Sequence, residues 1–129
     1  TLFPDTTLFR SLEVDPTRPV DTAVRSISGM LLNCLCPIDF ATGKEQHWWC
    51  GPTSTLQEPC FVPRSKDAPE GDGWIVQICN RIDLQRSDLL IFDALDIEKG
   101  PIATINVPIR LRFGLHGNWA NAEDVGLAA

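Results

Sequence analysis

The sequence contains no stretch of ten or more residues in which apolar side chains recur with the helical period of 3.6. Apolar residues instead gather in short runs, separated by turns that use many of the 9 Gly and 10 Pro residues. Short, evenly spaced strands of this kind are typical of β-sandwiches, β-barrels and β-propellers. The pattern therefore predicts an all-β fold, and no strong internal repeat selects one of these three architectures.

Three apolar runs in the second half of the chain have the strongest strand character. They cover residues 74–79, 89–94 and 102–107, and the last of them is β-branched and alternates with period two. A polar connection follows the first run, and a turn at 98–101 follows the second. We expect the three runs to form one antiparallel meander.

The remaining segments have weaker signals. Residues 30–50 are a candidate hairpin with its turn at 41–44, and a brief strand is expected at 60–62. The range 12–28 carries two Pro and has no clear period, so we interpret it as a loop or an edge segment. Residues 120–129 have no strand character.

The first eleven residues resemble a translated sequencing adapter. They read TLFPDTTLFRS, and Asp5 is the one difference from the adapter translation TLFPYTTLFRS. Segments of this origin are excluded from fold reasoning. We therefore expect a non-native leader at 1–11, an uncertain segment at 12–28 and the folded part at 29–129, with upstream sequence missing.

Composition excludes several classes of function. The net charge of −6 disfavours nucleic-acid binding, which needs a basic face. No apolar run approaches the roughly 20 residues of a membrane span, and no secretory signal is visible. The five Cys have no regular spacing, so we interpret them as reduced thiols of a cytoplasmic protein. Cys34 and Cys36 would share one face of a strand, which leaves metal or redox chemistry as the alternative.

Two residues are candidates for a site. His116 lies between Gly114 and Gly117, where a ligand or another backbone segment can approach closely; a core or surface His is the alternative. Glu58 opens the brief strand and is either a surface residue or the carboxylate partner of a ligand His. His47 stands beside two Trp, so we expect it on a packed strand face and not as a ligand.

Four motifs, in this order, resemble the last part of the carotenoid oxygenase family, which includes the carotenoid-cleavage and lignostilbene dioxygenases. The motifs are QEPCFVPR at 57–64, the DGW-containing strand at 72–74, RSDLLIFDALDIEKGPIATINVP at 86–108 and GLHGNW at 114–119. The longer stretches GPTSTLQEPCFVPR and PIRLRFGLHGNW are similar to the lignostilbene branch. The resemblance covers about residues 29–120.

This resemblance implies a seven-bladed β-propeller, of which the chain holds the C-terminal blades as antiparallel meanders. Family members bind Fe(II), which is non-haem, with four His, and Glu residues orient most of those His. They cleave a C=C bond of a carotenoid- or stilbene-like substrate with O₂, and some relatives isomerise a retinoid ester instead. By motif, His116 would be the last iron ligand and Glu58 the carboxylate that holds it.

The sequence departs from the family pattern in one respect: it has only two His, so three of the four expected ligands are absent. We therefore expect a fragment of a dioxygenase that acts on an apolar conjugated or phenolic alkene, and we expect the isolated fragment to be inactive. The alternative is a β-propeller fragment that serves as a binding or scaffold module without catalysis.

Overall fold

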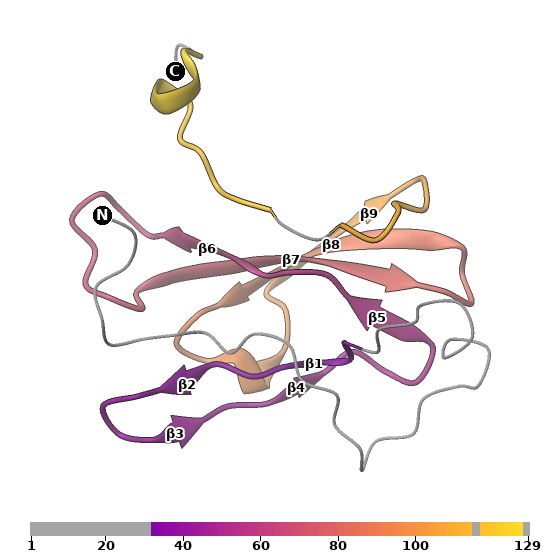
Figure 1. Cartoon of the computed structure of the whole chain (residues 1–129), viewed down its shortest axis with the longest axis horizontal. Helices are drawn as coiled ribbons and strands as arrows, with labels where there is room; N and C mark the ends of the chain where they lie inside the picture. The colour runs from indigo at the N-terminus through magenta and orange to yellow at the C-terminus, as the bar shows by residue number, and fades with distance from the viewer. Residues whose placement is uncertain (1–31, 115–116, 128–129) are drawn as a thin grey trace.

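The computed structural model describes residues 32–114 and 117–127. Its centre is an antiparallel sheet in which β5 (Ser54–Leu56), β7 (Gly73–Arg81), β8 (Arg86–Asp93) and β9 (Ala103–Val107) follow one another. A further strand, β6 (Cys60–Pro63), also pairs with β7 (Figure 1). The structure is therefore all-β with antiparallel sheets, and the predicted meander is confirmed because β7, β8 and β9 correspond to its three runs.

The alternation of side chains along β7 explains where the core lies. Ile75, Gln77 and Cys79 are buried, whereas the residues between them are half-buried. Ile75 pairs with Phe92 on β8, and directly opposed residues share one face of a sheet. The buried face is therefore made by alternate residues of both strands.

The strand on the other side of β7 is interrupted. β5 pairs with residues 79–81 of β7 and β6 pairs with residues 73–76, so both lie along the same edge. The interruption contains Pro59, which has no backbone N–H to donate to the sheet. Gln57 still donates its backbone N–H to Ile78 O on β7 at 2.9 Å, and Glu58 and Pro59 follow it before the pairing resumes at β6.

A long hairpin forms the second layer. It consists of β1 (Cys34–Leu35) with β4 (Trp48–Trp49) and of β2 (Ile38–Asp39) with β3 (Lys44–Glu45). A hydrogen bond from Gln46 N to Pro37 O at 3.1 Å joins the two pairs, so the register is continuous. The hairpin expected at 30–50 is confirmed over this part of its length.

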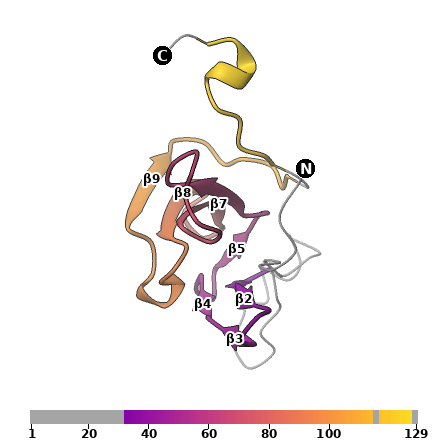
Figure 2. The same cartoon turned by 90° about the vertical axis from the view of Figure 1, so that its left-hand side faces the viewer.

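The hairpin packs on the buried face of the sheet. Leu35 is fully buried in the same cluster as Phe92, and the rings of Trp48 and Phe92 meet edge to face with centroids 4.9 Å apart. Figure 2 shows the hairpin and the sheet as two layers. This packing gives the hairpin one face toward the core and leaves the other face pointing away from the sheet.

The rest of the described chain is irregular. Short 3-10 helices occur at Ile97–Lys99 and Glu123–Val125, and the second projects away from both layers (Figures 1 and 2). Over 32–114 and 117–127 no helix is long and apolar enough to cross a membrane. The predictions for 1–11 and 12–28 fall outside the described residues.

Candidate metal centre

Glu58 lies where the chain passes from β5 to β6. Its Oε2 atom accepts a hydrogen bond from Gly117 N at 3.0 Å, although the two residues are 59 positions apart. The structure thus brings together the two motifs that contain the predicted site residues. His116 itself lies outside the described residues, so its predicted hydrogen bond with Glu58 stays a prediction.

Gln57 holds the segment 112–114, which leads to His116 in the sequence. Its Nε2 donates to Arg112 O at 3.1 Å, and its Oε1 accepts from Gly114 N at 3.1 Å. The backbone of Gln57 is held in turn, because Gln77 Nε2 donates to its carbonyl oxygen at 2.7 Å. Both amide side chains are buried, and such bonds are costly to leave unmade.

Gly114 gives the Gln57 amide room for this contact. A Cβ atom at this position would lie 2.8 Å from Gln57 Oε1, closer than real Cβ contacts. With any other residue at position 114, the Gln57 amide would have to shift away from the backbone. This contact gives a physical reason for the first Gly of the motif GLHGNW.

A second buried group fixes the start of the same segment. Ser87 Oγ accepts from Leu111 N at 2.9 Å and donates to Asn80 Oδ1 at 2.7 Å. Asn80 is on β7 and Ser87 on β8, and both are buried. The segment 111–114 is therefore held against the sheet by two side chains, Ser87 on β8 and Gln57 just after β5, and Asn80 on β7 in turn holds Ser87.

Cys60 connects the end of the segment with β6. Burial raises the pKa of the Cys60 thiol, a hydrogen bond with the backbone of Trp119 opposes this rise, and the charge of Glu58 adds to it. The thiol is therefore a neutral, protonated group at neutral pH.

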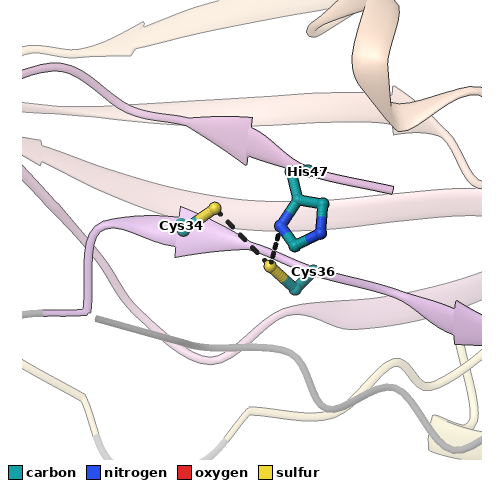
Figure 3. A group of neighbouring side chains, drawn as sticks. All are labelled: Cys34, Cys36 and His47. Carbon is teal, nitrogen blue, oxygen red and sulfur yellow. Dashed lines mark hydrogen bonds between the residues drawn. The ribbon is translucent and has the colours of Figure 1, made fainter. Parts of the chain in front are cut away.

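A separate group of possible metal ligands lies on the hairpin. Cys36 Sγ is 2.9 Å from His47 Nδ1 and 3.5 Å from Cys34 Sγ (Figure 3). The expectation that His47 is packed on a strand face is wrong, because half of its side chain (51%) is exposed. The signal in the sequence was the Cys-x-Cys pair with a His eleven residues later, but only the hairpin register joins them.

The chain matches proteins whose names describe oxygenases. A model of the retinal pigment epithelial membrane protein family (RPE65) matches residues 13–121. Lignostilbene-α,β-dioxygenase isozyme III of Sphingomonas paucimobilis is 48% identical over 118 residues, which are 92% of this chain and 24% of that protein. Isoeugenol monooxygenase of Pseudomonas nitroreducens is 54% identical over 72 residues, 56% of this chain and 15% of that protein.

A solved structure agrees with these matches. The crystal structure of Pseudomonas brassicacearum lignostilbene dioxygenase superposes with a TM-score of 0.79 at 42% identity, covering 84% of this chain and 23% of that one. The chain thus spans about a quarter of the length of such relatives. With the family match over 109 of its 129 residues (13 to 121 inclusive), the chain belongs to the RPE65 or carotenoid oxygenase family.

Proposed function

We propose that the protein that carries this chain is a non-haem Fe(II) dioxygenase that cleaves a C=C bond of a carotenoid- or stilbene-like substrate with O₂. In this proposal His116 is one of four His ligands, Glu58 orients it, and the main sheet is one blade of a seven-bladed propeller. The observation that carries the proposal is the contact between Glu58 and the backbone of Gly117, within a chain that belongs to the family.

The described residues fit an iron-ligand His at position 116. A ligating imidazole is neutral and donates its second ring N–H to an acceptor, most often a carboxylate or a carbonyl oxygen. Glu58 Oε2 is 3.0 Å from Gly117 N, so a carboxylate lies beside the neighbour of His116. The iron, when bound, would supply the activation of O₂ for alkene cleavage.

The residues of this chain act by positioning. Glu58 would hold the proton on one ring nitrogen of His116, so that the other nitrogen keeps its lone pair for the metal. Gln57 ties the backbone on the near side of the His, at Arg112 and Gly114. A ligand held from both sides loses little freedom on binding, which favours a preorganised site.

The names of the relatives support a phenolic alkene as the substrate. Lignostilbene and isoeugenol both have a C=C bond conjugated to a phenolic ring, and these names belong to the proteins that match with 48% and 54% identity. We therefore propose a stilbene-like compound as the preferred substrate. An assay with a stilbene-like compound and a carotenoid would test this, and faster cleavage of the carotenoid would favour the alternative.

The test uses the full-length protein and the variants His116→Ala and Glu58→Gln. His116→Ala should lose its iron and its activity. Glu58→Gln keeps the size of the side chain but removes the charge, so iron affinity or activity should fall by roughly 10- to 100-fold with the fold intact. Iron content by mass spectrometry, alkene cleavage and circular dichroism measure the three quantities.

Glu98→Gln is a matched control, because Glu98 is exposed on the 3-10 helix at Ile97–Lys99. It should leave iron and activity unchanged. A His116→Ala protein that keeps stoichiometric iron would disprove the ligand assignment. Full-length wild-type protein with neither iron nor cleavage of any tested alkene would favour the scaffold alternative.

A further inference from the structure

The hairpin register places Cys34, Cys36 and His47 on one face. Cys34 pairs with Trp49 and Leu35 with Trp48, so the next position sets Cys36 opposite His47. Opposed residues of an antiparallel pair point to the same side. Leu35 and Trp48 occupy the other face and pack in the core, so the two thiols and the imidazole lie on the opposite face of the hairpin. Figure 3 shows the three side chains gathered together beside the two strands.

The three donor atoms are close enough to share one ion. The Sγ atoms of Cys34 and Cys36 are 3.5 Å apart, His47 Nδ1 is 2.9 Å from Cys36 Sγ, and all three atoms lie within 4.8 Å of one another. Bonds of about 2.3 Å to a tetrahedral Zn(II) would separate two sulfurs by about 3.8 Å. The thiols therefore need to move apart by only a few tenths of an ångström.

The imidazole has a suitable orientation and room to adjust. Its Nε2 is 3.2 Å from Glu45 Oε2, so the carboxylate favours a proton on Nε2 and leaves the lone pair of Nδ1 toward the thiols. The His47 and Glu45 side chains are each 51% exposed. A small outward movement of His47 can consequently lengthen the short distance to Cys36 without disturbing the core.

We propose that Cys34, Cys36 and His47 bind a thiophilic d¹⁰ metal ion, Zn(II) or Cu(I), at a site separate from the iron site. Two thiolates neutralise the two charges of Zn(II), and sulfur and imidazole donors select these ions over iron and magnesium. Solvent supplies the fourth ligand of Zn(II) on the exposed side of His47, whereas Cu(I) is satisfied by the three donors alone.

A disulfide fits this pair less well than a metal. Two residues that are two positions apart on an extended strand have Cα atoms about 6.6 Å apart, near the upper limit for a disulfide. Cys34 and Cys36 are present as thiols, and both are buried. The cross-strand His47 adds a donor that a disulfide does not use.

The site has a structural consequence. Cys34 and Cys36 lie on and just after β1, and His47 directly precedes β4, so a shared ion clamps the two strands together. Trp48, which packs on Phe92, follows His47 immediately. The ion therefore holds the hairpin in the register that presents Trp48 to the core, and its removal should lower the melting temperature.

The experiment measures metal stoichiometry in the iron-loaded full-length protein after titration with Zn(II), with Cu(I) under anaerobic conditions, or with Co(II) as a spectroscopic probe. Wild-type protein should bind one equivalent of zinc or copper in addition to the iron, and Co(II) should give sulfur-to-metal charge-transfer absorption. Cys34→Ser/Cys36→Ser should lose this equivalent and the absorption band while iron content stays unchanged.

Matched variants separate this site from the proposed iron site. His116→Ala should lose iron and keep the zinc equivalent, so the two proposals can fail independently. His47→Gln can still reach Glu45 but lacks the donor at Nδ1, and it should weaken zinc binding at least 10-fold. Cys60→Ser changes a half-buried thiol outside the cluster and should leave zinc stoichiometry unchanged.

Two results would overturn the proposal. One is that wild-type protein binds none of the three ions more tightly than the Cys34→Ser/Cys36→Ser variant does. The cluster would then be only a thiol–imidazole hydrogen bond and not a metal site. The other is a double variant that keeps the full zinc equivalent. Circular dichroism of each variant establishes that it is folded, and zinc-dependent protection of the 34 and 36 thiols from alkylation provides a second readout in wild-type protein.

Discussion

Gln57 is a single side chain that ties two backbone groups across the structure. Its amide donates to Arg112 O and accepts from Gly114 N, both at 3.1 Å, and the residue is 8% exposed. A carboxylate at this position could not donate to Arg112 O, and an apolar side chain could make neither bond. The amide is therefore the one group of this size that satisfies both partners.

Replacement of Gln57 with Met keeps the volume and removes both hydrogen bonds. Each bond contributes about 0.5–1.5 kcal/mol, so the variant should lose about 1–3 kcal/mol of local stability. Hydrogen exchange at residues 110–114 should become faster, and mass spectrometry of the corresponding peptide measures the change. Gln85→Met removes a bond to Ile82 O in the turn after β7 and is the control. Equal exchange in wild-type and Gln57→Met protein would contradict the role of Gln57.

Asp88 joins three strands of the sheet through one carboxylate. Its Oδ2 accepts from Arg81 Nε on β7 at 3.0 Å, and its Oδ1 accepts from Asn106 Nδ2 on β9 at 2.9 Å. Arg86 forms an ion pair with Oδ1 at 3.1 Å. Burial opposes ionisation of Asp88, but the hydrogen bonds from Arg81 and Asn106 and the charges of both Arg outweigh burial, so the pKa of this carboxyl is lowered.

This shift predicts a loss of stability in acid. Because the pKa of Asp88 is lower in the folded state than the usual 3.8, its contribution is fully present above pH 3.8 and disappears as the pH falls through the folded value. Denaturant midpoints measured from pH 5 down to pH 2 should therefore decrease in wild-type protein and decrease less in Asp88→Asn. Asp67→Asn, an exposed Asp in the loop after β6, should follow the wild-type curve. Parallel curves for Asp88→Asn and wild type would show that ionisation of Asp88 does not contribute to the stability of the folded state.

At the scale of the whole molecule, the last strand of the sheet and its flanks expose large apolar side chains. On the last strand and its flanks, Ile102, Ile105 and Ile109 are 60%, 52% and 62% exposed. The chain spans about a quarter of the length of the relatives it matches. A sheet of this size with an apolar outer strand is suited to further packing partners, which the rest of a longer protein would provide.

Isolated residues 12–129 should therefore not retain iron or turn over an alkene. The chain has only two His, and one ligand with water cannot replace four imidazoles. The measurement is the iron-to-protein ratio after mild chelation, together with an assay on a stilbene-like substrate; the full-length protein is the positive control. Stoichiometric iron that survives chelation in the fragment would refute this prediction.

Much of the fold follows from local sequence. Strands β7, β8 and β9 are each a short apolar run between turn residues, which predicts strands, and a meander is the pairing that short connections allow. The hairpin at 34–49 follows from the same signals. The resemblance of four motifs to the carotenoid oxygenases also predicts Glu58 and His116 as site residues.

The tertiary structure alone decided which polar groups meet. Gln57 and Gly114 are 57 positions apart. No periodic pattern in the sequence predicts that the side-chain amide of Gln57 binds the backbone of Gly114. The group of Cys34, Cys36 and His47 depends on the register of the hairpin, since a slip by one residue would turn His47 to the other face. Local patterns set which residues form strands, because strand formation depends on neighbours in sequence. Register and long-range contacts depend on how the hairpin packs through Trp48 on Phe92, and that is a property of the assembled core.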